Sequence, residues 1–261
     1  MKSLLQERLN TALKKSIHNA ALVLKSSGAP LVFLLFLLSF LLAYRAFLHW
    51  LPPSFPVIYP LTVLLAYLLF VQRIYTWLKP ADLVFLLPME THMATYFRHT
   101  LWINLGLTLM RAGIILAILY PFYQDRFHHA GPFWSLASEF MLLAVWNTTM
   151  VWLEDRQALT YPKWNRWAKG IRLALNLILI YLFLTIHHLA EGLLLMIPVG
   201  YCIGIWRKTP SYPYPWILWI KKQQTATNRW LAFFHWLADA KPRKRKIRAT
   251  QWFFSILNAL L

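Results

Sequence analysis

The sequence is poor in charge, and poorest in acidic charge. Only 14% of its 261 residues are Asp, Glu, Lys or Arg, and only 9 of these are acidic. Soluble domains usually carry about a quarter charged residues. Hydrophobic residues make up 59% of the chain and the mean hydropathy is +0.46. This composition predicts a membrane protein and argues against a soluble one.

Cysteine and glycine are also scarce. The single cysteine, Cys202, excludes an intrachain disulfide framework and a cysteine-based zinc site. The sequence has only 8 glycines and no G-x-x-x-x-G-K-[ST] motif, so no Walker loop can hold ATP phosphates and Mg²⁺ in this chain. The H-E-x-x-H and G-x-S-x-G signatures are missing as well. We therefore expect no cofactor, no metal and no catalytic residue in this chain.

Long apolar runs predict about six transmembrane helices, because a span needs roughly 20 mainly apolar residues. Four runs are clear, at about 28–48, 55–72, 99–121 and 132–153. Two more come from 173–206, which is broken at 187–192 and forms a tight hairpin or a partly re-entrant pair. The fold class predicted is all-α, a polytopic helical membrane protein.

The basic residues set the predicted orientation. The formal charge is +18, and 24 of the 27 Lys and Arg residues precede the first run or lie in alternate segments after it. The other segments contain only Arg45 and Arg126. Because Lys and Arg are retained on the cytoplasmic side, both ends of the chain are predicted to lie in the cytoplasm. The chain is predicted to be a multi-pass protein of the cell membrane. The predicted domains are a cytoplasmic helix at 1–26, a transmembrane domain at 27–206 with a cytoplasmic loop at 73–98, and a cytoplasmic region at 207–261.

The N-terminal 25 residues have the pattern of an amphipathic helix. Leu5, Leu9, Leu13 and Ile17 share one face at 100° per residue, and the charged residues lie opposite. Such a helix lies along the cytoplasmic membrane surface. Two roles stay open, an anchor that sets the topology and a mechanical element.

The C-terminal region combines aromatic and basic residues. An aromatic stretch that starts at Trp216 and Trp219 and runs to Leu237 is predicted to be interfacial. The following cluster, Lys241, Arg243, Lys244, Arg245, Lys246 and Arg248, is predicted to bind anionic lipid headgroups rather than nucleic acid. The last apolar run, 251–261, either lies in the interface or is the front portion of a longer segment.

Two charged residues, Arg111 and Glu139, fall inside predicted spans. A lone charge in hydrocarbon is costly, so we expect both to face the bundle interior, and their similar depth predicts an ion pair. A fixed packing contact is the alternative. Two polar clusters, His187, His188 and Glu191, and Asp125, His128 and His129, have metal-ligand residue types, but polarity at the headgroup level explains them more simply.

The most distinctive segment lies between the second and third predicted spans. Pro80 suits the first turn of a helix, Asp82 favours its positive end, and Pro88 would end it, which predicts a short helix at about 80–87. Its apolar residues are Leu83, Val84, Phe85, Leu86 and Leu87. This helix is too short to span and too apolar for water, so we expect it to dock in a protein groove or on the membrane.

The sequence LKPADLVFLLPME in this loop resembles the permease subunits of bacterial ABC exporters of the Ecs type, the EcsB family. The segment from Tyr214 to Trp216 and the KPR-K-R run are similar to that family as well. The resemblance implies a coupling helix that contacts a separate cytoplasmic ATPase, which binds ATP and Mg²⁺. Its residues would be Lys79, Pro80, Ala81, Asp82, Leu83, Val84, Phe85, Leu86, Leu87, Pro88 and Glu90. Family members are longer than this sequence, so the resemblance implies a truncated member.

The resulting prediction is a permease subunit that exports a peptide-like or amphipathic substrate and supports protein secretion. Its expected partners are the ABC ATPase, a second permease copy and anionic lipids, with no nucleic acid. The alternatives are a membrane-embedded enzyme that uses the His/Glu clusters, and a regulatory membrane scaffold without transport.

Overall fold

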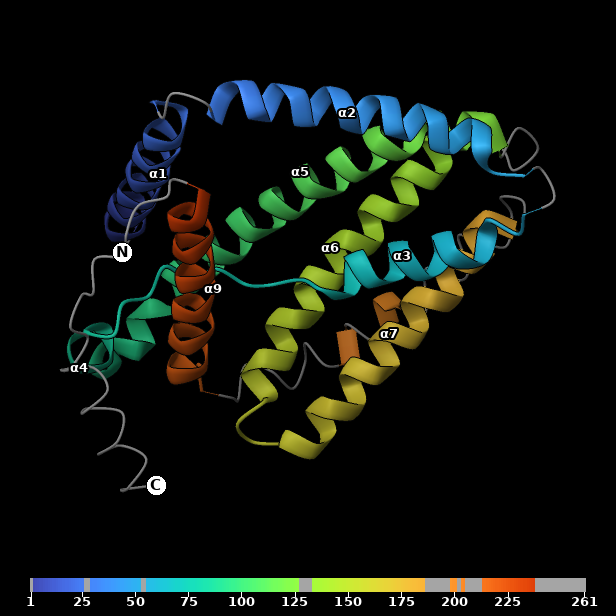
Figure 1. Ribbon diagram of the computed structural model, residues 1–261. Helices are drawn as coiled ribbons and strands as arrows, with labels where there is room; N and C mark the ends of the chain where they lie inside the picture. The colour runs from blue at the N-terminus through green and yellow to red at the C-terminus, as the bar shows by residue number, and fades with distance from the viewer. Residues whose placement is uncertain are drawn as a thin grey trace. The chain divides into compact units, whose positions relative to one another are not determined.

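The regular structure is helical throughout the part of the chain that the structure describes. The computed structural model describes residues 2–25, 29–52, 55–126, 133–185, 198–200, 203–204 and 213–237. The principal helices are α1 (Lys2–Lys25), α2 (Ala29–Trp50), α3 (Ile58–Phe70), α4 (Asp82–Phe85), η1 (Leu87–Met93), α5 (Ala94–Arg126), α6 (Phe133–Gln157), α7 (Pro162–Thr185) and α9 (Trp216–Leu237) (Figure 1). The prediction of an all-α fold is confirmed.

Four of these helices are long and apolar enough to cross a membrane. They are α2, within which the apolar window is Leu31–Leu48, and then α5, α6 and α7. The second predicted span differs: α3 has only 13 residues, or about 20 Å of helix, against roughly 30 Å of hydrocarbon. The sixth predicted span falls mostly outside the described residues. Six spans and their orientation therefore stay predictions.

Several predicted boundaries were wrong, and proline and charge explain the errors. α7 begins at Pro162, a favoured first helical residue, about eleven residues before the predicted start. The prediction placed those residues in a loop because four of them are basic. α5 has 33 residues and includes Pro121 in its last turns, so it extends beyond the predicted span at both ends.

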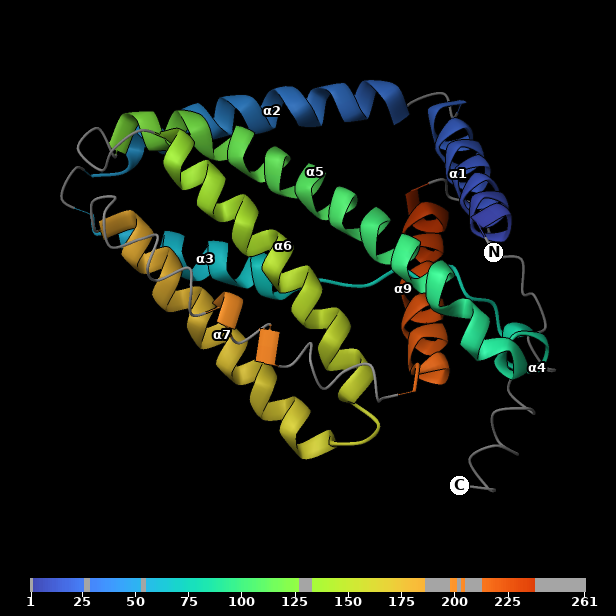
Figure 2. The same cartoon turned by 180° about the vertical axis from the view of Figure 1, so that it is seen from behind.

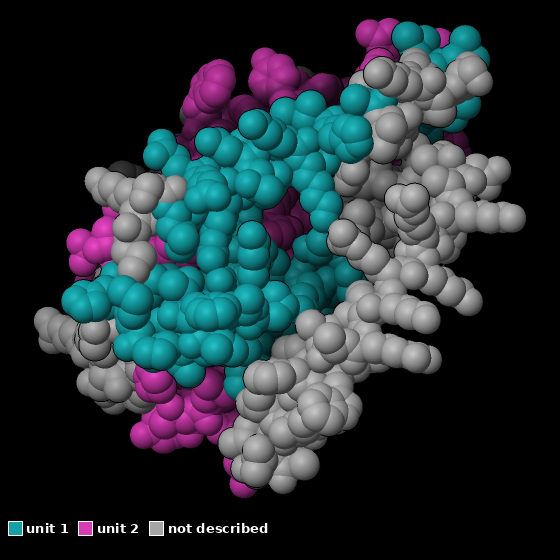
Figure 3. All heavy atoms as spheres, turned by 90° about the vertical axis from the view of Figure 1, so that its left-hand side faces the viewer, with its two compact units in different colours: residues 1–36, 76–93, 216–261 teal, residues 37–75, 94–215 magenta. Residues whose placement is uncertain are grey.

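The chain divides into two compact units. Unit 1 contains residues 1–36, 76–93 and 216–261, and unit 2 contains residues 37–75 and 94–215. Figure 3 shows that most of the visible atoms of unit 1, which come from segments far apart in the sequence, lie together, with a smaller group apart from them in this view. These parts come mainly from the three regions for which the sequence predicts a cytoplasmic location.

Unit 2 is built around α6. This helix packs against α3, α5 and α7, and 72% of its most apolar window is buried. Both ribbon views show α6 and α7 running side by side after a tight turn, with α3 along α7 (Figures 1 and 2). In unit 1, α1 packs against α9. The two units thus hold the two groups of residues described next.

Candidate functional site

The short helix predicted at about 80–87 is present, but it is shorter and continues differently. The α-helix α4 covers only Asp82–Phe85, and Pro80 and Ala81 form the turn before it. Pro88 does not end the helical segment, because the 3-10 helix η1 runs through it and kinks at Met89. A proline early in a new helical turn loses no hydrogen bond, so it starts η1 rather than stopping α4. η1 leads directly into α5.

Asp82 holds α4 in place through three hydrogen bonds. Both Nη atoms of Arg8, on α1, donate to its carboxylate at 2.7 Å, and the backbone N–H of Lys79 donates to it at 2.6 Å. Asp82 is 6% exposed and the Arg8 side chain 11%. A bidentate Arg–carboxylate pair fixes orientation as well as distance. Asp82 lies at the helix start, as predicted, and its carboxylate also fixes α4 to the N-terminal helix α1. We call this Arg8–Asp82 pair the clamp.

The approach to α4 is also fixed. Trp77 has a positive φ of 53°, a conformation that costs a bulky residue roughly 1–3 kcal/mol. Its carbonyl accepts a hydrogen bond from Arg8 at 3.3 Å. The hydroxyl of Thr76 donates to the side-chain oxygen of Gln223, on α9, at 3.3 Å. Unit 1 therefore supports this strained turn from two helices.

An apolar surface remains on the outside of the clamped segment. Phe85 is 73% exposed and Val84 57%, and Leu87 and Met89 are exposed as well. We call these four residues the apolar face. Leu83 and Leu86 are half-buried. A rigidly held turn with an exposed phenylalanine has the form of an anchor for a groove in another protein.

The remaining predicted coupling residues border this apolar face. Lys79, Ala81 and Pro88 are exposed, whereas Pro80 is half-buried. Glu90 is half-buried and has an interaction partner. Leu13 and Ile17 are also exposed on α1, while Leu5 on the same predicted face is buried. The predicted N-terminal helix therefore exists, and its residues 13–18 are exposed to a membrane surface or a partner.

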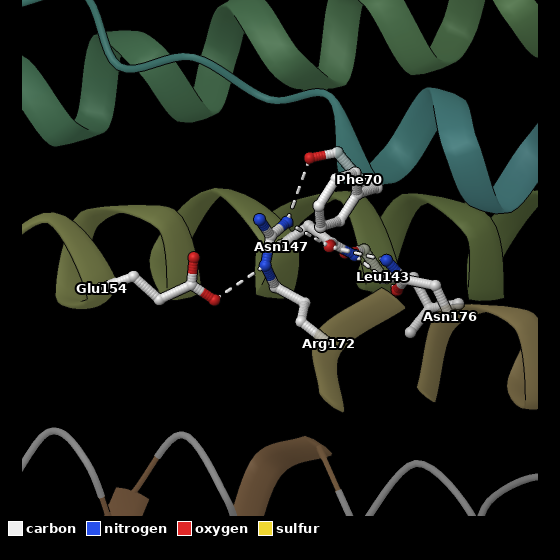
Figure 4. A network of polar contacts seen from close by, with 6 residues as sticks. All are labelled: Phe70, Leu143, Asn147, Glu154, Arg172 and Asn176. Atoms are coloured by element: carbon white, nitrogen blue, oxygen red, sulfur yellow. Dashed lines mark hydrogen bonds and ion pairs between the residues drawn. The ribbon is translucent and has the colours of Figure 1, made fainter. Parts of the chain in front are cut away.

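Unit 2 contains a buried polar network that the sequence analysis did not predict (Figure 4). Arg172 on α7 donates from Nε to Glu154 on α6 at 2.8 Å, and both side chains are at most 3% exposed. Its Nη1 donates to the Asn147 side-chain oxygen at 3.0 Å and to the Phe70 carbonyl at 3.2 Å. The amides of Asn147 and Asn176 donate to one another at 2.8 and 2.9 Å.

This network explains how the short helix α3 is continued. After Phe70 the chain runs extended, and non-helical backbone at membrane depth must have its polar groups satisfied by protein. Arg172 binds the last carbonyl of α3. Asn104 on α5 accepts from the Tyr75 N–H at 2.9 Å and donates to the Tyr75 carbonyl at 2.8 Å. We conclude that polar residues in the long helices secure the chain between α3 and the coupling segment.

A signal for the network was available in the spacing of the sequence. Arg172 and Asn176 are four residues apart, and Asn147 and Glu154 are seven apart, so each pair shares a helix face. Arg172 had been placed in a cytoplasmic loop because hydropathy assigns basic residues to loops. For Arg8 no local signal existed, because its partner Asp82 lies 74 residues away.

The other intramembrane charges do not form the expected pair. Arg111 is exposed on α5, while Glu139 is 8% exposed on α6 and has another interaction. No ion pair joins the two in the described structure, where the pair between α6 and α7 is Glu154 with Arg172. Hydropathy places a charge at a depth but does not say which side of the helix faces a neighbour.

Several other expectations lie wholly or partly outside the described residues. They include the basic cluster 241–248, the histidine pairs at 128–129 and 187–188, and Cys202. Within the described ranges no group of three His, Cys, Asp or Glu residues could hold a metal ion. Trp216 and Trp219 are buried within the protein, and their position at the membrane–water boundary stays a prediction.

Within unit 2, Tyr214 packs against side chains of α5 and α6. Its ring lies 4.2 Å from that of Phe97 on α5, and the Arg156 guanidinium lies 4.4 Å above it. Phe97 also contacts Trp152 on α6, at 6.2 Å between ring centroids. A stacked cation and an aromatic neighbour contribute roughly 0.5–2 kcal/mol each. Tyr214 therefore helps to hold α5 and α6 together near Phe97 and Arg156.

The helices and their polar network define the class of this chain, a helical membrane protein with candidate spanning helices. The chain belongs to the EcsB family, since the family model described as "Bacterial ABC transporter protein EcsB" matches residues 2–261. The resemblance expected from the coupling segment is confirmed. Membership makes the chain a membrane component of an ABC transporter system, which implies an ATPase partner. No curated protein and no solved structure matches.

Proposed function

We propose that the chain is the permease subunit of an ABC exporter and that the segment 79–90 is its contact with the ATPase. The observation that carries the proposal is the apolar face, held by the Arg8–Asp82 pair and led by a 73% exposed phenylalanine, Phe85. Exposed apolar residues in a fixed turn are unfavourable in water, and a groove on a partner protein would cover them. Partner binding therefore accounts for both the rigidity and the exposure.

A coupling role further requires a path for motion, and the chain provides two. Residues 71–81 join α4 to α3, and η1 continues directly into α5. Movement of α4 by the ATPase would reach α3 and α5 along the backbone. The bonds of Asn104 to Tyr75 and of Arg172 to Phe70 stiffen the first path. ATP and Mg²⁺ would act in the partner, and this chain would supply the moving helices.

The family resemblance supports the finer parts of the proposal. These are export of a peptide-like or amphipathic substrate in support of protein secretion, a second permease copy, and a location in the cell membrane. The basic cluster at 241–248 would bind anionic lipid.

The test is replacement of Phe85 by aspartate. A charged side chain at the centre of an apolar contact should cost at least about 2 kcal/mol, or about thirtyfold in affinity. We expect Phe85→Asp to lose the ATPase when the tagged full-length chain is purified from its native membranes under mild conditions. Mass spectrometry of the co-purified proteins provides the measurement.

Leu159→Asp is the matched control. Leu159 is 62% exposed in the turn between α6 and α7, and it is predicted to lie on the same side of the membrane. It should keep the ATPase. Equal recovery of the ATPase with both variants would contradict the proposed contact, and absence of any ATPase from the unmodified complex would favour a scaffold or enzyme.

A further inference from the structure

Unit 2 contains an apolar cavity of about 750 Å³ near the C-terminal end of α2. Its volume falls within the range of about 300–1,000 Å³ that is usual for small-molecule sites. Residues from three helices line it, including Tyr44, Phe47 and Trp50 from α2, Leu64 and Leu68 from α3, and Ile115 from α5. No charged residue is among its described lining residues. The cavity is therefore suited to hydrocarbon.

A smaller pocket of about 360 Å³ adjoins this cavity and differs from it in charge. The two share Phe55 and Val57 as lining residues. The smaller pocket is lined in addition by Arg126 and by two stacked tyrosines, Tyr59 and Tyr181, whose ring centroids are 6.1 Å apart. Arg126 is the single charged residue among the described residues that line either space. An apolar space thus ends beside a cation and two phenols.

Neutral groups fix the position of Arg126 and leave its charge largely uncompensated. It donates to the carbonyls of Leu48, Leu51 and Pro52. Its one ion pair, with Asp125 at 3.1 Å, involves a carboxylate that is 52% exposed. A guanidinium has five N–H donors; the three carbonyl bonds use one on Nη1 and both on Nη2, which leaves one on Nη1 and the buried Nε–H without a hydrogen bond. The site complements an anion attached to an apolar chain.

The surroundings identify where such a ligand comes from. None of the apolar window of α2 is buried inside the protein, and Val63, Leu64 and Tyr67 are exposed on α3. In a membrane these surfaces meet lipid. We propose that the cavity and its adjoining pocket bind one anionic phospholipid of the bilayer, with an acyl chain in the apolar cavity and the phosphate at Arg126. This site does not involve the apolar face, so it stands independently of the ATPase contact.

The test is lipid binding to the delipidated full-length chain in detergent, followed by native mass spectrometry. Dioleoyl phosphatidylglycerol and dioleoyl phosphatidylcholine have the same acyl chains and differ in net charge. We expect one phosphatidylglycerol to bind about tenfold more tightly than phosphatidylcholine, because the choline cation of phosphatidylcholine offsets the attraction of its phosphate to Arg126. Equal affinity for the two lipids would overturn the proposal.

Two neighbouring residues on α3 provide a matched pair for the cavity. Leu64→Trp fills the cavity and should lower phosphatidylglycerol binding about tenfold, equivalent to displacing a few buried methylenes. Val63→Trp adds the same side chain at an exposed position outside the lining and should leave binding unchanged. Identical binding by the two variants, or a changed oligomeric mass in place of a changed lipid count, would contradict a lipid site.

Substitutions that remove or keep the positive charge at Arg126 test the proposed headgroup contact. Arg126→Gln should abolish the preference for phosphatidylglycerol, and Arg126→Lys should retain it, because lysine also binds phosphate as a point charge. If Arg126→Gln preferred phosphatidylglycerol as strongly as the unmodified chain, the headgroup assignment would be wrong. Arg126→Gln loses three hydrogen bonds to carbonyls and could fail to fold. In that case the Leu64→Trp and Val63→Trp pair still tests the acyl-chain cavity, and Arg126→Lys still tests the headgroup contact.

Discussion

Arg172 shows how one buried charge can organise several helices. It contacts Glu154 and Asn147 on α6, the last carbonyl of α3, and the ring face of Phe70 at 4.7 Å. A buried ion pair adds little net stability compared with an apolar pair of the same volume, but removal of one partner leaves a charge without compensation. The pair therefore contributes to specificity, because the Nε and Nη1 donors of Arg172 find these acceptors together only when α3, α6 and α7 converge as they do here.

Arg172→Met should destabilise the folded chain by about 3–5 kcal/mol, since Glu154 is then buried without its partner. The apparent Tm in detergent, followed by fluorescence-detected size exclusion, provides the measurement. Arg166→Met, at an exposed position of the same helix, is the control and should be neutral. The double variant Arg172→Met/Glu154→Leu should recover much of the loss. A Tm for Arg172→Met equal to that of the control would show that the network is dispensable.

At the scale of elements, α4 cannot be stable alone. It has four residues, too few for an isolated helix, so contacts from elsewhere must hold it. The N-terminal helix supplies the main one through Arg8, and α9 supports the preceding turn through Gln223. The amphipathic α1 thus has a positioning role for α4, which favours the mechanical alternative left open by the sequence.

Asp82→Asn distinguishes the contribution of the ion pair with Arg8 from that of the hydrogen bond to the Lys79 backbone. Asparagine can still accept from the Lys79 N–H but cannot form an ion pair with Arg8. Because hydrogen bonds to charged groups contribute about 1.5–3 kcal/mol, hydrogen exchange of amides 82–86 should accelerate about tenfold or more. Arg8→Gln should have the same effect, and the double variant should add little to either. Lys14→Gln, exposed on α1, is the control; additive effects of Arg8→Gln and Asp82→Asn would disprove the clamp.

At the scale of the whole molecule, the proposed function depends on orientation. The basic residues predict that the coupling segment and the α6–α7 turn face the cytoplasm and that the turn before α3 faces outward. The predicted cytoplasmic loop and both terminal regions contribute segments to unit 1.

Cysteine labelling in intact cells tests the orientation. In a background with Cys202→Ser, a membrane-impermeant maleimide should label Phe55→Cys in intact cells. Phe85→Cys and Leu159→Cys should react only after permeabilisation, and all three positions are exposed in the structure. Labelling of Phe85→Cys from outside would place the apolar face away from any cytoplasmic ATPase and end the coupling proposal.

Much of the fold and part of the site could be predicted from sequence because they depend on local patterns. Apolar runs and their length predict membrane helices whatever their neighbours are, and the motif around Phe85 predicts an exposed apolar turn and the family. The same rules were wrong where a charged residue is buried. Arg172 and the residues before it belong to α7, which starts at Pro162, although the sequence predicted a loop there.

By itself, the sequence determined the helical class, the family and the position of the short apolar helix near Phe85, since composition, periodicity and a contiguous motif are properties of neighbouring residues. The tertiary structure alone decided which charges meet. Arg8 pairs with Asp82, and Arg172 rather than Arg111 finds a glutamate, because a pair forms where two helix faces converge at one depth. The rotation of each helix about its axis depends on packing, and no single stretch of sequence contains that information.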